Sequence, residues 1–186
     1  MDHGASSYRR FLQGDDSGFE EIVRTYSDGL ILYLYGYVSD FHLAEDLCED
    51  TFFRLLVKKP RFDGRSSFKS WLYTIGKNLA TDHLRRAKKY QTAEYEGDYP
   101  DGDTPERKLL KEEQRVQLYR ALQTLKTEYR CALYLLYFEG FDMEQTAKHL
   151  GKTKHQTETL VWRAKNALKG KLEEEAKTAE RKNSVF

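Results

Sequence analysis

Apolar side chains recur along most of the chain at steps of three and four residues, the spacing that places them on one face of an α-helix. The alternation with a period of two that indicates a strand is absent, and the 186 residues include three prolines. The pattern predicts an all-α protein without a sheet. Its interruptions indicate two small helical domains, the second a helix-turn-helix domain, joined by an acidic flexible linker.

The first domain is predicted to span residues 1–90 as short helices separated by turns. The sequence SGFE at residues 17–20 is typical of a capping box, so a helix is expected to open with Ser17 as its cap and to continue through the apolar run LILYLYGYV. Asp40 is the expected N-cap of the next helix, and Pro60 is expected to end it.

A further helix is predicted after a turn at Asp63 and Gly64, with Ser66 or Ser67 as its N-cap. A glycine in the middle of a helix costs about 1 kcal/mol relative to alanine. Gly76 occupies such a position. We therefore expect a neighbouring helix or a nucleotide to approach the backbone closely there.

This helix has two chemically different faces. Trp71 lies between them and is assigned to the core, the alternative being a contact residue. The apolar face consists of Phe68, Leu72, Ile75 and Leu79. The other face carries small hydroxyl groups, one amide and basic groups: Ser70, Thr74, Lys77, Asn78, Thr81 and Arg85. An ordinary solvent-facing helix more often mixes Glu with Lys, so the polar face is a candidate binding surface.

Residues 91–104, QTAEYEGDYPDGDT, are the predicted linker, because they are acidic, contain turn residues and lack a helical period. Thr104 followed by Pro105 predicts that helix restarts there. The second domain is assigned to residues 105–175, and residues 176–186 form a polar tail.

The second domain contains a spacing typical of a helix-turn-helix: Ala147 four residues before Gly151, Leu150 just before it and Leu160 nine after it. The small Ala allows two helices to cross closely, and Gly adopts the left-handed turn. The second helix of the motif is expected to begin near Lys154. Its apolar stripe is Leu160, Val161, Ala164 and Leu168. Its exposed face offers Lys154, His155, Glu158, Thr159, Trp162, Arg163 and Lys165.

Charge is segregated along the chain although the net charge is only +1. Residues 1–60 carry six Lys and Arg against eleven Asp and Glu, whereas residues 61–90 carry eight against two and residues 151–186 carry nine against five. Two separate basic segments favour two contacts with a polyanion, and the acidic first segment favours a different partner.

The sequence shows no arrangement typical of catalysis or metal binding. The five histidines lack metal-ligand spacing, and there is no phosphate-binding glycine loop or nucleophile elbow. Cys48 and Cys131 lie in separate apolar helical patterns and are expected to be buried, reduced thiols. We expect a protein that is not an enzyme and uses no cofactor and no metal.

Membrane insertion is not expected either. No apolar run reaches the roughly 18 to 20 residues that span a bilayer, and the first residues lack the pattern of a signal peptide. The predicted location is the cytoplasm.

Three segments together resemble a known family. They are LAEDLCEDTFFRLL at residues 43–56, FKSWLYTIGKNLATDHLRR at residues 68–86, and the helix-turn-helix that ends in WRAKNALK. In this order around an acidic linker they resemble the extracytoplasmic-function (ECF) sigma factors of bacterial RNA polymerase, over about residues 8–172. The resemblance implies a region 2 domain at residues 1–90, which binds polymerase and melts the minus-ten element, and a region 4 domain at residues 105–175, which binds the minus-thirty-five element.

The resemblance also implies a polymerase contact on the helix that follows Asp40, with the clamp helices of the largest subunit as partner. The contacting residues would be Asp46, Glu49, Asp50 and Phe53. The opposite face, with Ala44, Cys48, Phe52 and Leu55, would pack in the core. The alternative is that Phe53 belongs to the core and the acidic groups only face solvent.

By the same resemblance, residues 61–67 and the helix after them would bind the opened minus-ten strand. The candidate residues are Arg61, Asp63, Ser66, Lys69, Tyr73, Lys77, Asn78, Thr81 and Arg85. In the helix-turn-helix, base-reading positions would be occupied by Glu158, Thr159, Trp162 and Arg163, with Lys154, His155 and Lys165 near phosphates. An anti-sigma protein that covers both domains is a further implied partner.

Three residues depart from the family pattern. Lys152 and Thr157 stand where aliphatic packing residues are usual, and Glu158 stands where a basic residue is common. The Lys stem and the Thr methyl group can still cover apolar surface. Glu158 could accept a hydrogen bond from a cytosine amino group, or it could lower DNA affinity until polymerase contributes the rest.

Two other functions fit parts of the pattern. A stand-alone helix-turn-helix regulator would bind duplex DNA tightly as a homodimer without polymerase. An interaction protein that uses only the acidic helix would be insensitive to charge reversal at Lys77 and Arg163.

Overall fold

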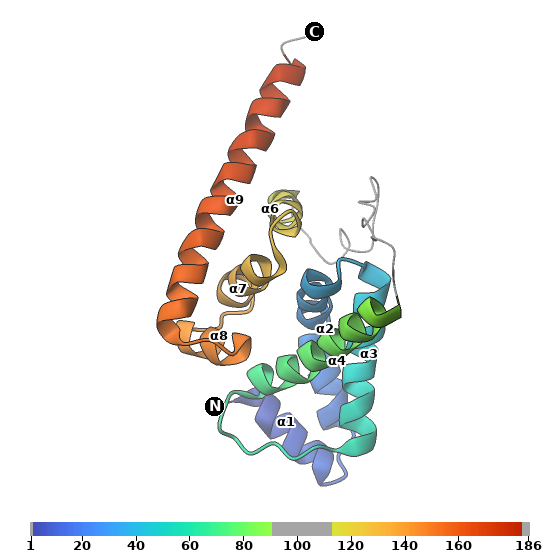
Figure 1. The fold of residues 1–186 in the computed structure, drawn as a ribbon. Helices are drawn as coiled ribbons and strands as arrows, with labels where there is room; N and C mark the ends of the chain where they lie inside the picture. Colours follow the sequence, from blue (N-terminus) through green and yellow to red (C-terminus); the bar gives the residue numbers. More distant parts are fainter. Residues whose placement is uncertain (1, 91–112, 184–186) are drawn as a thin grey trace. The chain divides into compact units, whose positions relative to one another are not determined.

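The computed structural model describes residues 2–90 and 113–183, and every regular element in these ranges is an α-helix (Figure 1). The all-α prediction is confirmed. The chain divides into two compact units, Met1–Glu106 (the first unit) and Arg107–Phe186 (the second unit). The predicted linker at residues 91–104 and the predicted helix start at Thr104 and Pro105 lie outside the described residues.

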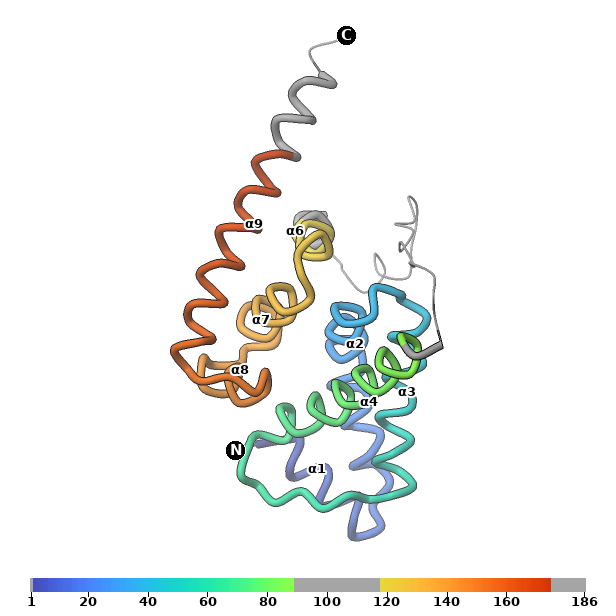
Figure 2. Tube along the Cα trace, viewed as in Figure 1, coloured from blue at the N-terminus to red at the C-terminus, as the bar shows by residue number. Residues whose placement is uncertain are grey.

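The first unit contains four helices packed around one core. They are α1 (His3–Leu12), α2 (Ser17–Val38), α3 (Phe41–Lys58) and α4 (Phe68–Tyr90). Helix α2 packs against the three others, and α3 also packs against α4, as the trace in Figure 2 shows. Aromatic and leucine side chains fill the centre, and the largest fully buried ones include Tyr8, Phe11, Leu30, Tyr33, Leu34, Leu55, Phe68, Leu72 and Tyr73.

Most of the predicted helix ends in the first unit are confirmed. The carboxylate of Asp40 accepts a hydrogen bond from the Leu43 backbone N–H at 3.0 Å and caps α3, which ends at Lys58, two residues before Pro60. The Ser67 hydroxyl accepts from the Ser70 N–H at 3.2 Å at the start of α4.

The capping box at Ser17 was predicted wrongly. Ser17 is the first residue inside α2, and its backbone N–H donates instead to the Asp15 carboxylate at 3.1 Å. Asp15 also accepts from the Ser17 hydroxyl, and the hydroxyl oxygen accepts from the Arg10 guanidinium at 2.9 Å rather than from a backbone N–H of α2. A carboxylate two residues earlier in the chain thus supplies the acceptor that the pattern assigned to the serine.

The buried face of α4 is wider than the periodicity predicts, because α4 packs against both α2 and α3. Phe68 and Leu72 are buried as expected, and Ile75 and Leu79 are only half-buried. The residues that complete the buried face are Ser70, Tyr73, Gly76 and Ala80. Relative to the predicted apolar face, α4 is therefore rotated so that the Gly76 side packs against its neighbours. Ser70 belongs to the buried side rather than to the polar face.

The close approach expected at Gly76 is made by neighbouring helices. A Cβ atom at this position would lie 3.1 Å from a methyl group of Leu30 and 3.4 Å from one of Leu34, both on α2, and 3.2 Å from the hydroxyl of Thr51 on α3. Gly76 therefore allows α4 to contact both helices at one point.

The second unit contains α6 (Glu113–Gln123), α7 (Thr127–Tyr137), α8 (Met143–Leu150) and α9 (Lys154–Asn183). Helix α9 packs against α6, α7 and α8. The buried apolar cluster of the second unit contains Leu122, Leu125, Ala132, Leu133, Leu160, Val161 and Ala164. The last three confirm most of the predicted apolar stripe of α9. The helix continues to Asn183, into the predicted polar tail.

We expect Gly76→Val to lower the free energy of unfolding by about 1–3 kcal/mol, because the added methyl groups would overlap Leu30, Leu34 and Thr51. Urea denaturation followed by circular dichroism measures the change. Gly170→Val is the matched control, because a Cβ atom at Gly170 has no neighbour within 4 Å. Equal stability of Gly76→Val and the wild type would contradict the packing described here.

Candidate nucleic-acid and protein interfaces

Helix α8 begins and ends with hydrogen bonds that fix the geometry of the helix-turn-helix. The Asp142 carboxylate accepts from the Gln145 N–H at 2.7 Å, and the Gln145 side chain accepts from the Asp142 N–H at 3.0 Å, forming a capping box. At the other end, Gly151 adopts a φ of 68°, and the Lys152 N–H donates to the Ala147 carbonyl at 2.9 Å. The predicted left-handed turn at Gly151 is confirmed.

Helix α9 begins at Lys154, as predicted, because Thr153 and Gln156 form a second capping box. The Thr153 hydroxyl accepts from the Gln156 N–H at 3.2 Å, and the Gln156 side chain accepts from the Thr153 N–H at 2.9 Å. Thr157 is fully buried, and its hydroxyl donates to the Thr153 carbonyl at 2.9 Å. Thr157 therefore occupies an interior position without leaving an unpaired hydroxyl.

The outward face of α9 is basic with an aromatic centre. Trp162 is 66% exposed, which is unusual for so large an apolar side chain. Thr159 is half-buried, and the exposed neighbours of Trp162 are Lys154, His155, Glu158, Arg163 and Lys165. The helix thus presents together the residues that the sequence placed on its outer face.

Acidic and aromatic groups lie close to several of these exposed side chains. The Lys154 ammonium lies 3.4 Å from the Glu144 carboxylate, and the His155 ring lies 4.0 Å from the Glu158 carboxylate. The Lys165 ammonium lies 5.1 Å from the centre of the Tyr137 ring. These contacts are exposed and individually weak, so they leave the side chains able to turn toward a polyanion.

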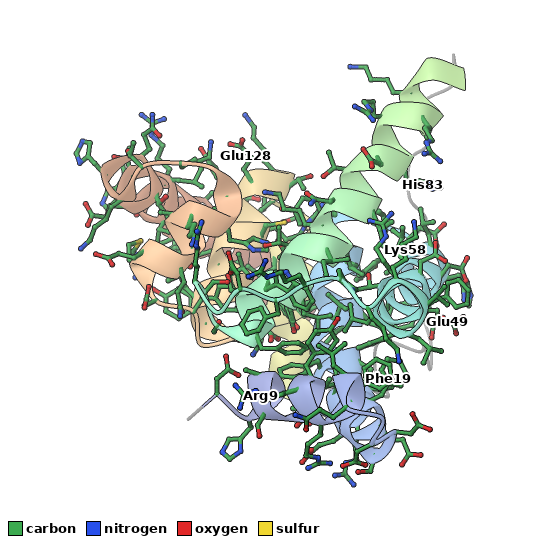
Figure 3. The ribbon with its side chains drawn as sticks, turned by 90° about the horizontal axis from the view of Figure 1, so that it is seen from below. Arg9, Phe19, Glu49, Lys58, His83 and Glu128 are labelled. Carbon is green, nitrogen blue, oxygen red and sulfur yellow. The ribbon has the colours of Figure 1, made fainter. Side chains whose placement is uncertain are left out.

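The polar face of α4 is only partly as predicted. Asn78, Thr81 and Arg85 are exposed, and Lys69 and Lys77 are half-buried. The outer half of α4, marked by His83 in Figure 3, is exposed from Thr81 to Arg86. This face can meet the backbone and bases of a nucleic-acid strand.

Tyr73 was predicted to line the strand path, and this is wrong. Its ring is fully buried, with its centre 5.2 Å from that of Tyr33 on α2. The rotation of α4 that buries Gly76 also turns Tyr73 into the core. A tyrosine can pack in a core or stack against a nucleotide, so the residue type alone does not show which of these roles Tyr73 has.

The loop between α3 and α4 has a turn at its exposed tip. The Asp63 carboxylate accepts from the Arg65 N–H at 3.1 Å and lies 3.4 Å from the Arg65 guanidinium, and Gly64 adopts a φ of 72°. Arg61 and Asp63 are exposed, and Ser66 is half-buried. Asp63 thus shapes the turn, while Arg61 and Arg65 give the tip its positive charge.

Helix α3 has an acidic outer face that ends in an apolar patch. Asp46, Glu49 and Asp50 are exposed, and Glu49 lies on the outer side of the helix in Figure 3. Phe53 is 63% exposed, so the alternative that places it in the core is wrong. Ala44, Cys48, Phe52 and Leu55 are buried as predicted.

The sequence reasoning missed Leu56 and Val57, which are also exposed and extend the patch begun by Phe53. Their positions three and four residues after Phe53 place them on the same side of the helix. That spacing could have identified them. We refer to Phe53, Leu56 and Val57 as the α3 apolar patch.

The two cysteines are buried thiols, as expected. Burial, together with the nearby carboxylates of Glu49, Asp28 and Glu45, raises the pKa of Cys48 to about 12, so its thiol stays protonated. Within residues 2–90 and 113–183, no cluster of His, Cys, Asp or Glu could hold a metal ion. In the same ranges, no helix has the length and hydropathy of a membrane span.

Two family models match the chain. Residues 22–90 match Sigma-70 region 2, and residues 115–168 match Sigma-70, region 4. The chain is 29% identical over 170 residues to the RNA polymerase sigma-H factor of Pseudomonas aeruginosa, with 86% of this chain and 88% of the relative covered. It is 30% identical over 154 residues to the RNA polymerase sigma factor YlaC of Bacillus subtilis, with 81% and 89% covered. It is 32% identical over 136 residues to the ECF RNA polymerase sigma factor SigC of Mycobacterium tuberculosis, with 71% of each chain covered.

The fold is also similar to those of two proteins solved in complexes with partners. The sigma factor RpoE of Bartonella quintana, in complex with the anti-sigma factor NepR, matches with a TM-score of 0.65 and 24% identity over 83% of this chain and 96% of that one. CnrH, in complex with the cytosolic domain of CnrY, matches with a TM-score of 0.62 and 20% identity over 92% and 95%. The matched regions, the relatives and the helix-turn-helix geometry agree: the chain belongs to the ECF sigma factors of bacterial RNA polymerase.

Proposed function

We propose that this sigma factor programs core RNA polymerase through one protein-binding surface and two DNA-binding surfaces. Residues 1–90 would bind polymerase and open the minus-ten element, and residues 105–175 would bind the minus-thirty-five element. The observation that carries the proposal is that the first unit presents an acidic outer face on α3 and a basic outer face on α4. Two faces of opposite charge on separate helices allow a protein and a DNA strand to be bound at once.

The α3 face would bind the clamp helices of the largest polymerase subunit. The α3 apolar patch supplies an anchor that loses contact with water on binding, and Asp46, Glu49 and Asp50 supply a charged rim. Aromatic anchors surrounded by charged residues are typical of specific protein interfaces. The acidic rim also makes this face a poor binding site for DNA.

The α4 face and the loop before it would bind the opened minus-ten strand. Promoter opening without nucleotide hydrolysis requires that the protein bind single-stranded DNA better than duplex, by enough to offset about a few kcal/mol for each unstacked step. The basic and polar groups available for this are Arg61, Ser66, Lys69, Lys77, Asn78, Thr81 and Arg85. Asp63 would contribute by holding the turn at the tip of the loop.

Helix α9 would enter the major groove at the minus-thirty-five element. Arg163 can donate hydrogen bonds to base edges, and Glu158 can accept them. Trp162 offers an apolar contact, and Lys154 can reach phosphates. The chemistry that joins nucleotides would belong to polymerase, so the sigma factor itself would need no catalytic group and would act in the cytoplasm beside it.

An anti-sigma protein is the proposed regulator. RpoE and CnrH, which share this fold, were solved in complexes with the anti-sigma factor NepR and with the cytosolic domain of CnrY. A partner of this kind would cover the α3 apolar patch, because the same exposed groups that anchor polymerase can anchor a competitor.

We expect Glu49→Lys/Asp50→Lys to reduce the affinity for core polymerase at least about tenfold, because the substitutions reverse the charge around Phe53. Titration of labelled protein with core polymerase measures the affinity. The control is Glu173→Lys/Glu174→Lys, which changes the net charge equally at exposed positions on α9. Unchanged core affinity in a folded Glu49→Lys/Asp50→Lys protein would contradict the assignment of α3.

We expect Arg163→Ala to weaken holoenzyme binding to a promoter that the holoenzyme transcribes by about 1–3 kcal/mol, because a base-reading side chain is lost. Binding to the same promoter with a scrambled minus-thirty-five element should not change. Lys169→Ala, an exposed basic residue farther along α9, is the matched control. Equal losses on both promoters would assign Arg163 to phosphate contact instead.

A further inference from the structure

The loop between α3 and α4 is attached to α1 at its first residues. The Tyr8 hydroxyl on α1 donates to the Pro60 carbonyl at 2.7 Å. Tyr8 is almost fully buried, and burial raises the pKa of its hydroxyl to about 12. The hydroxyl therefore remains a protonated donor, and the bond holds the start of the loop against α1.

The end of the loop is attached to the residue before α1. One oxygen of the Asp2 carboxylate accepts from the Ala5 N–H at 3.2 Å and caps α1, and the other accepts from the Phe68 N–H at 2.6 Å. A single carboxylate therefore caps both α1 and α4. The start of α4 cannot move away from α1 without losing a charge-assisted hydrogen bond.

The middle of the loop is attached through an aromatic cluster. The Phe62 ring centre lies 5.2 Å from that of Trp71 and 5.7 Å from that of Phe68, and Tyr8 lies 5.4 Å from both. Gly4 allows α1 to approach Phe68 closely, since a Cβ atom there would lie 2.5 Å from the Phe68 ring. Tyr8 on α1 and Phe62 in the loop thus belong to one aromatic cluster, which attaches the loop to α1.

These three attachments leave Arg61 and the tip of the loop, from Asp63 to Arg65, exposed. A loop that is ordered before it binds loses less conformational entropy on binding, which raises its affinity for a ligand. Helix α1 precedes residue 22, where the match to Sigma-70 region 2 begins. The function of α1 therefore does not follow from the family match.

We propose that α1 is a positioning element for promoter opening: Tyr8 and Asp2 hold the loop at residues 61–67 in the shape that captures an unpaired base of the minus-ten strand. The inference rests on the proposed function of this loop. Tyr8 and Asp2 do not touch the base; they fix the backbone on both sides of the residues that do.

The experiment uses holoenzyme and a single-stranded oligonucleotide with the minus-ten sequence of a promoter that the holoenzyme transcribes. A set of oligonucleotides, each lacking one base, locates the captured position as the one where base removal weakens binding most. Tyr8→Phe keeps the ring and removes the bond to Pro60. We expect it to weaken binding of the intact strand about three- to tenfold and to leave binding of the strand that lacks the captured base unchanged.

Two further sets of variants separate positioning from general stability. Asp2→Ala should reproduce the loss, and Asp2→Asn should retain part of the binding because its amide oxygen can still accept one of the two bonds. Tyr37→Phe is the matched control, because it removes a tyrosine hydroxyl of the same unit that lies near the end of α2, where it accepts from the Tyr33 hydroxyl at 3.2 Å. Its binding should equal that of the wild type.

Three results would overturn the inference. If Tyr8→Phe and Asp2→Ala bind the intact strand like the wild type, α1 does not position the loop. If they lose equal affinity for the intact strand and the strand that lacks the captured base, their role is general stability. If the wild type binds every oligonucleotide of the set as tightly as the intact strand, the loop captures no base. Its proposed function then fails together with this inference.

Discussion

The close packing of α4 against α2 and α3 at Gly76 determines which side chains of the first unit meet solvent. Because Leu30, Leu34 and Thr51 occupy the space of a Cβ atom there, α4 rests on both helices at once. Its rotation then follows: Tyr73 and Ala80 turn inward, and Asn78, Thr81 and Arg85 turn outward. The candidate DNA surface is thus a consequence of helix packing, since the same contact that stabilises the core sets the direction of the polar side chains.

The same core separates the two kinds of partner. Helix α3 buries Ala44, Cys48 and Leu55 and so presents its acidic groups and the α3 apolar patch on the opposite side. Helix α4 presents basic and polar groups from a different side of the bundle. The acidic face repels a phosphate backbone and the basic face attracts it, which reduces competition between polymerase and DNA for one site. In the second unit, capping boxes at Asp142 and Thr153 fix the starts of α8 and α9, the two helices of the helix-turn-helix.

Local chemistry made much of this structure predictable, whereas contacts between distant residues did not. Asp40, Ser67 and Gly151 were correctly placed because caps and left-handed turns depend on a few neighbouring residues. Tyr73 was misplaced because periodicity describes one buried face, and α4 packs against two helices. The bonds of Asp2 to Phe68 and of Tyr8 to Pro60 join residues 66 and 52 positions apart, and no local pattern encodes such pairs.

Transcription reconstituted from purified components shows whether this chain directs initiation by core RNA polymerase. The full chain and core RNA polymerase from the same organism are combined on its genomic DNA, and transcript starts are mapped. We expect defined starts only when both proteins are present, and weak duplex binding by the chain alone. A homodimer that binds duplex DNA tightly without polymerase, and that yields no initiation with it, would contradict a role as a sigma factor and favour a stand-alone regulator.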